Sequence, residues 1–178
     1  MIMKITRSIH LIVCAFVLIV GTISAPSQAS IITLTASIDG AQANAGLGTG
    51  SLGTGLANMF YDDVSNAFSW DISWSGLTGV VTVAHFHGAA LPDQNAGVEV
   101  PISTLFNPTS GSTFISAAQA ADLLAGLWYV NIHSDFSPGG EIRGQVIADK
   151  VTKVSLPGML SLLLLSMVGI FYSGGTKR

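Results

Sequence analysis

The feature that most constrains the fold is a strict alternation of apolar and polar residues between two turn signals. In the segment 68–74, Phe-Ser-Trp-Asp-Ile-Ser-Trp, every second residue is large and apolar. Because successive side chains of a β-strand point to opposite faces, this spacing places all four apolar side chains on one face. The pair Asp62-Asp63 before it and Gly76 after it are typical of turns. The segment predicts a strand with one face in a core, and its aromatic stripe indicates core rather than a sugar platform.

The same period of two recurs through the middle of the chain. Further strands are predicted at 32–38, 53–61, 80–87, 99–102, 127–133 and 141–148. One short helix is predicted, because Ser116 and Gln119 form a capping box and Gly126 is a usual terminator. Together these elements predict an all-β fold, a single antiparallel β-sandwich or barrel-like domain. The glycine-rich stretch 40–55 is open to two interpretations, a flexible insert or a loosely packed strand.

The first 29 residues predict a secretory signal peptide. Two basic residues precede an apolar run at 9–20, and the small residues Ser27 and Ala29 stand at positions −3 and −1 of a cut before Ser30. Signal peptidase recognises this arrangement. The protein is therefore expected to be exported.

The segment 154–178 predicts a transmembrane helix with a basic tail. The 19 residues from Val154 to Tyr172 carry no charge, and a run of this length can span a bilayer. Lys177 and Arg178 follow, and basic residues of this kind stay on the cytoplasmic side. The domain is therefore expected at the outer face of the membrane, the cell surface or outside the cell.

The C-terminal segment also resembles the PEP-CTERM class of bacterial sorting signals, especially its Val-x-Leu-Pro variants. The motif here is Val154-Ser155-Leu156-Pro157-Gly158, followed by the apolar helix and the basic end. The resemblance implies cutting near Pro157 by an exosortase-type transpeptidase. The chain lacks the Pro-Glu-Pro triplet of the class, so a plain membrane anchor is the alternative.

Residues 30–153 form the one segment that is expected to fold in water. Its roughly 124 residues are enough for one domain with its own core. Ten acidic residues stand against Arg143, Lys150 and Lys153, which gives a net charge of −7. This charge argues against nucleic acid and anionic lipid as partners. The segment has no cysteine, since Cys14 lies in the leader, so the domain must be stable outside the cell without disulfides.

Three histidines at the ends of two predicted strands form the candidate site. His85 and His87 project together because residues two apart share a strand face, and His133 ends the other strand. An H-x-H pair with a third histidine offers the imidazole nitrogens that zinc and copper bind. Glu141 or Asp135 could complete such a ligand set.

The alternative interpretation of this region is a structural network. Asn131, Glu141, Arg143 and Gln145 lie close to the histidines in sequence. Polar side chains of this kind can satisfy one another and the loop backbone through hydrogen bonds. The planar fork of Arg143 is expected to act as a clamp that bridges to a carboxylate or to a loop.

No catalytic residue is predicted. The glycine-rich stretch 48–53 is not the strained Gly-x-Ser-x-Gly turn of serine hydrolases. Asp62-Asp63 belong to a turn and Glu99 to a strand, so the carboxylates do not form a pair suited to glycoside chemistry.

Six segments in order along the middle resemble the CHRD domain, which is named from chordin and also occurs singly in secreted bacterial proteins. They are 37–42, Ser-Ile-Asp-Gly-Ala-Gln; 74–79, Trp-Ser-Gly-Leu-Thr-Gly; 84–90, Ala-His-Phe-His-Gly-Ala-Ala; 123–126, Leu-Leu-Ala-Gly; 129–133, Tyr-Val-Asn-Ile-His; and 140–145, Gly-Glu-Ile-Arg-Gly-Gln. The chain departs from the family's pattern at 43–45, where Glu-Val-Pro is frequent, and at Phe86, where isoleucine or valine is commoner.

The resemblance implies an all-β extracellular module with no established catalytic activity. The expected function is a secreted or surface-anchored module with a binding or structural role, whose partner is an extracellular protein or polysaccharide. The alternative is a copper- or zinc-binding protein, or a metal-dependent enzyme, that uses the three histidines. A weaker similarity to copper-zinc superoxide dismutase rests on the H-x-H strand, and the other metal histidines and the disulfide of that enzyme have no clear counterparts here.

Overall fold

The alternating segment 68–74 lies within strand β3 (Ala67–Ser75) of the computed structural model, which describes residues 30–149. The side chains of Phe68 and Ile72 are fully buried, whereas Asp71 on the opposite face is exposed. The other elements are β1 (Ile31–Asp39), β2 (Thr54–Asp62), β4 (Val81–Gly88), β5 (Gly97–Ile102), β6 (Thr109–Phe114), α2 (Ala117–Leu124), β7 (Tyr129–Ser134), β8 (Ile142–Gln145) and β9 (Ile147–Ala148). The predicted all-β fold with one short helix is confirmed.

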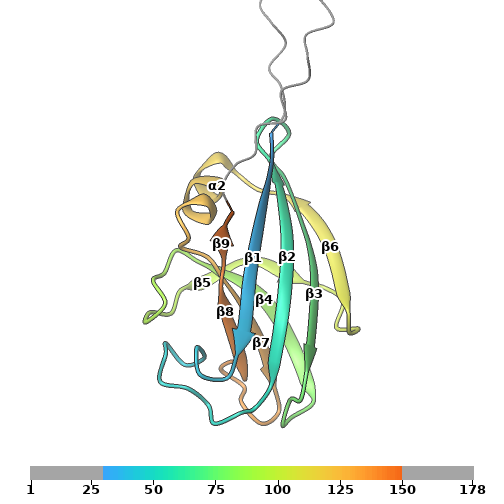
Figure 1. Cartoon of the computed structure of the whole chain (residues 1–178), viewed down its shortest axis with the longest axis vertical. Helices are drawn as coiled ribbons and strands as arrows, with labels where there is room; N and C mark the ends of the chain where they lie inside the picture. Colours follow the sequence, from blue (N-terminus) through green and yellow to red (C-terminus); the bar gives the residue numbers. More distant parts are fainter. Residues whose placement is uncertain (1–29, 150–178) are drawn as a thin grey trace, which may run out of the picture.

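The strands form one antiparallel sheet that curls into a nearly closed barrel (Figure 1). Its order is β5-β4-β7-β8-β1-β2-β3-β6, with β9 paired to β1. The two strands at the ends of this order, β5 and β6, do not pair with each other within the described residues. The barrel therefore has one open seam.

An aromatic cluster fills the barrel. Phe86 of β4 lies edge-on to Phe68, with ring centroids 5.1 Å apart, and to Trp70, with centroids 5.5 Å apart. Trp128, just before β7, also packs edge-on against Phe68 at 5.7 Å. Edge-to-face contacts of this kind stabilise a core beyond the burial of apolar area alone.

The helix begins as the capping box predicts. The Ser116 hydroxyl accepts a hydrogen bond from the Gln119 backbone N–H, and the Gln119 side chain accepts one from the Ser116 backbone N–H. Ala120 and Leu123 bury the inner face of α2 against the core. The helix lies at the end of the barrel opposite the loops 40–53 and 135–141 (Figure 1).

Two of the expected segments lie outside the described residues. They are the signal peptide at 1–29, which includes Ala29, and the membrane or sorting segment at 154–178, which includes Pro157. Within residues 30–149, no helix is both long enough and apolar enough to cross a bilayer.

Candidate metal centre

The three candidate histidines share the face of the sheet that points away from the core. On β4, Ala84 and Phe86 face the core, so His85 and His87 face the opposite way. The antiparallel register with β7 pairs Val83 with His133. His133 therefore lies diagonally next to His85, which brings the three imidazoles together in the middle of the strand pair.

The imidazole nitrogens converge on one point. One ring nitrogen from each of His85, His87 and His133 lies within 4.8 Å of the other two. For three atoms this close, some point lies within about 2.8 Å of all of them, and a zinc–imidazole bond is about 2.0–2.1 Å long. Small side-chain adjustments would bring all three nitrogens to bonding distance of a metal ion.

Two of the histidines are held in the Nδ1–H tautomer, which leaves Nε2 able to bind a metal ion. Nδ1 of His87 lies 3.0 Å from the Ala96 carbonyl oxygen, and Nδ1 of His133 lies 2.8 Å from the Pro138 carbonyl oxygen. Because a carbonyl oxygen can accept but not donate, each Nδ1 carries the proton. The lone pair is therefore on Nε2, as in metal ligands whose other nitrogen bonds a carbonyl.

Several polar atoms of the site have no hydrogen-bond partner in the described structure. They are Nδ1 of His85, Nε2 of His87 and Oδ1 of Asn131, and all three are buried. Native proteins satisfy most buried polar atoms, so an unsatisfied one suggests a missing water or ion. Nε2 of His133 is 3.4 Å from the side-chain nitrogen of Asn131.

The surroundings keep His85 and His87 neutral. Burial lowers the pKa of His85, and the neighbouring His133 and His87 lower it further. Burial also lowers the pKa of His87, although its bond to the Ala96 carbonyl opposes this shift. Neutral imidazole is the form that binds metal, so these pKa shifts favour coordination at neutral pH.

The loop 89–96 covers the outer face of the sheet beside His87. The buried Arg143 side chain donates hydrogen bonds to the carbonyl oxygens of Gln94, at 2.7 Å, and Leu91, at 3.1 Å. The Gln145 side chain donates to the carbonyl oxygens of Ala90 and Gly126. Both residues therefore hold the segment 89–96 against the outer face of the sheet.

Glu141 does not face the histidines. Its buried carboxylate accepts hydrogen bonds from the hydroxyls of Ser51 and Ser134 and from the backbone N–H groups of Thr78 and Gly79. Burial acts to raise its pKa, but the four hydrogen bonds outweigh it and lower the pKa to about 2. Glu141 thus joins two loops to the end of β7, while Asn131, Arg143 and Gln145 lie beside the histidine site.

Two further contributors to the site were not identified in the sequence. Tyr129 stacks on His87, and the Ala96 peptide contacts both of these residues. Tyr129 lies two residues before Asn131 on the same strand, so the period of two would have placed it on the histidine face. Ala96 acts through its backbone and has no polar side chain, so no sequence pattern pointed to it.

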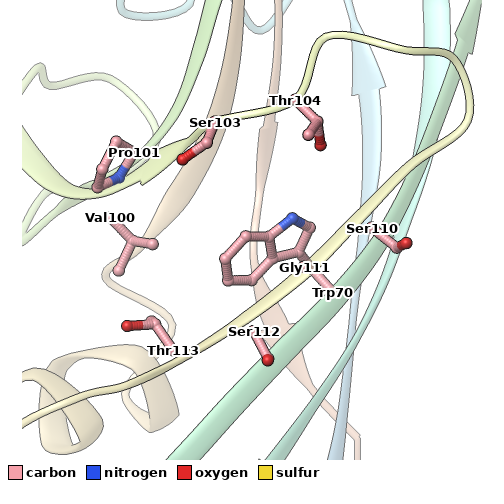
Figure 2. A pocket seen from close by; sticks show the side chains of 9 residues that line it. All are labelled: Trp70, Val100, Pro101, Ser103, Thr104, Ser110, Gly111, Ser112 and Thr113. Atoms are coloured by element: carbon pink, nitrogen blue, oxygen red, sulfur yellow. The ribbon is translucent and has the colours of Figure 1, made fainter.

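The open seam of the barrel forms a separate groove of about 360 Å³ between β5 and β6 (Figure 2). Its lining consists of Trp70, Val100, Pro101, Ser103, Thr104, Ser110, Gly111, Ser112 and Thr113. Trp70 is 7% exposed, in agreement with its predicted role in the core. No histidine, cysteine or carboxylate lines the groove, so among the described residues the candidate metal ligands are those of the histidine cluster.

The fold and the site define a class of protein: an antiparallel β-barrel module with three histidines on its outer face. The family model of the CHRD domain matches residues 34–146, and the chain belongs to this family. The family resemblance seen in the sequence is therefore confirmed, and it is consistent with an extracellular module. No curated protein and no solved structure matches the chain.

Proposed function

We propose that this protein is a non-enzymatic extracellular CHRD module that binds copper or zinc through His85, His87 and His133. The observation that carries the proposal is the convergence of three imidazole nitrogens within 4.8 Å of one another. The Nδ1 hydrogen bonds of His87 and His133 already fix both imidazoles with the lone pair on Nε2, so little ordering is needed on binding. The side-chain nitrogen of Asn131 would give up its 3.4 Å contact with Nε2 of His133 when a metal ion binds.

The donor set favours copper and zinc among the common metals. Imidazole suits both ions, whereas calcium and magnesium prefer oxygen ligands. In the general order of affinities Cu²⁺ binds more tightly than Zn²⁺ at such a site. Three protein ligands leave one position open for water or for a group from a partner.

Metal binding is expected to stabilise the fold. Cu²⁺ or Zn²⁺ is added to the metal-free full-length protein until the free metal concentration is 100 times Kd. The free energy of unfolding should then rise by about 2.7 kcal/mol. Calorimetric titration should give one site per chain, and His133→Ala should weaken binding at least tenfold. Asp122→Ala, which removes a half-buried carboxylate on α2, is the control and should bind as the parent does. An unchanged melting temperature with both metals would exclude the proposal.

The module is proposed to act at the outer face of the cell envelope, with an extracellular protein or polysaccharide as its partner. Signal peptidase would remove residues 1–29, and the segment 154–178 would hold the protein in the membrane or serve as a sorting signal. We expect an exosortase to cut near Pro157 and release a C-terminal tag. A mature protein that keeps the tag on immunoblotting would instead be anchored by the intact helix.

A further inference from the structure

Two flat groups, the Tyr129 ring and the Arg143 guanidinium, are stacked behind the proposed metal ligand His87. The phenol ring of Tyr129 lies parallel to the His87 imidazole, with centroids 5.0 Å apart and planes inclined by 5°. The guanidinium carbon of Arg143 lies 3.5 Å from the centroid of the same phenol ring. The three residues come from β4, β7 and β8, which are neighbours in the sheet. The stack therefore crosses three strands on the histidine face.

The stack also holds the backbone of one residue of the covering loop, Ala96, through both its N–H and its carbonyl oxygen. The Ala96 backbone N–H donates a hydrogen bond to the Tyr129 hydroxyl at 3.1 Å. The Ala96 carbonyl oxygen accepts the hydrogen bond from Nδ1 of His87. Tyr129 thus holds the backbone of Ala96, whose carbonyl oxygen in turn fixes the tautomer of His87.

Arg143 attaches the same loop at two more points, the carbonyl oxygens of Leu91 and Gln94. Its remaining acceptors are the side-chain oxygens of Asn95 and Gln145, so every recorded hydrogen bond of Arg143 ends on a neutral oxygen. The residue is only 2% exposed.

Burying a cation without a carboxylate in contact is unfavourable, so the arginine must contribute something that a neutral side chain would not. Its planar guanidinium can stack on an aromatic ring and reach two carbonyl oxygens at once. Lysine has the same charge but neither the plane nor the fork.

We propose that Tyr129 and Arg143 are positioning residues for the metal ligand His87: together they fix its ring plane and, through the Ala96 carbonyl, its Nδ1–H tautomer. The inference rests on the proposed metal function. Groups that orient a metal ligand typically change metal affinity about 10–100-fold when they are removed.

Three variants separate the contributions. Tyr129→Leu removes the aromatic plane, and Arg143→Lys keeps the charge but removes the fork; each should weaken Cu²⁺ binding about 10–100-fold. Tyr129→Phe keeps the stack and loses the hydroxyl that holds Ala96, so we expect a smaller loss and a mixture of His87 tautomers. Met59→Ala, a core substitution in β2 that contacts none of these groups, is the control for lost stability.

Two readouts go beyond stability. The Cu²⁺ electron paramagnetic resonance spectrum reports ligand geometry and should change in Tyr129→Leu and Arg143→Lys but not in Met59→Ala. In the metal-free protein, ¹⁵N chemical shifts should show His87 protonated at Nδ1 in the parent and mixed in Tyr129→Leu.

The outcomes distinguish the two proposals. If the parent binds neither Cu²⁺ nor Zn²⁺, the metal function fails, and the ¹⁵N shifts still decide whether Tyr129 fixes His87. If the parent binds Cu²⁺ and both Tyr129→Leu and Arg143→Lys retain its affinity, spectrum and tautomer, the positioning role is overturned.

Discussion

Replacing Glu141 with glutamine is expected to lower the free energy of unfolding by about 3 kcal/mol. Each carboxylate oxygen accepts one hydroxyl and one backbone N–H. The serine hydroxyl facing the new amide can rotate and accept a hydrogen bond from it. A backbone N–H can only donate, so it cannot pair with the amide NH₂ group. The glutamine NH₂ group would therefore face the part-buried backbone N–H of Thr78 or Gly79, and the charge-assisted hydrogen bonds would be lost.

The same variant should also change how the free energy of unfolding depends on pH. Since the pKa of Glu141 falls from 4.5 to about 2 on folding, the ionised carboxylate stabilises the fold fully above pH 4.5. That contribution is lost as the pH falls toward 2, because the unfolded chain binds the proton first. Glutamine does not titrate, so the difference between the parent and Glu141→Gln should shrink over this range.

Thermal unfolding at several pH values measures both effects. Near neutral pH the melting temperature of Glu141→Gln should be roughly 10–15 °C below that of the parent. Glu99→Gln is the matched control, because the Glu99 carboxylate accepts one recorded side-chain hydrogen bond, from Gln119. That substitution should change stability by less than about 0.5 kcal/mol. Equal melting temperatures for Glu141→Gln and the parent would show that the four hydrogen bonds of the Glu141 carboxylate do not stabilise the fold as expected.

Phe86→Ala is expected to destabilise the domain by about 3–5 kcal/mol. The ring is completely buried and contacts Phe68, Trp70 and Trp128. Alanine would leave a cavity among rings that are held by opposite strands and cannot all move in to fill it. The loss should be visible in chemical denaturation as a lower midpoint with an unchanged slope.

Phe86→Ile tests whether volume or aromatic contact is responsible. Isoleucine is a residue that the CHRD pattern commonly has at this position, and it keeps much of the buried volume. We expect a loss of less than about 2 kcal/mol, because the edge-on contacts disappear while the cavity stays small. If the isoleucine and alanine variants are equally unstable, cavity formation is not the cause.

Strands with large alternating side chains could be predicted from the sequence because burial on one face leaves a period of two. Strand β6 could not, since Thr109–Phe114 reads Thr-Ser-Gly-Ser-Thr-Phe and has no apolar alternation. Its place beside β3 comes from backbone pairing and from the close approach of Gly111 to the Trp70 ring. A Cβ at Gly111 would collide with that ring, so the residue that weakens the strand signal is the one the packing requires.

The site was only partly predictable for a similar reason. That His85 and His87 share a face follows from their spacing, but their contact with His133 depends on the register that sets Val83 opposite it. The contacts of Arg143 are even harder to predict from the sequence. The expected clamp reaches loop carbonyls 49 and 52 residues away rather than the neighbouring Glu141, whose carboxylate is engaged by other loops.

Strand β4 carries the proposed metal ligands His85 and His87 on one face and the aromatic Phe86 of the core on the other. A slip of one residue against β7 would turn His85 and His87 into the barrel and expose Phe86. Such a misfolded chain would lose its metal affinity at the same step as its core. Occupancy of the proposed metal site would then report whether β4 is correctly paired with β7.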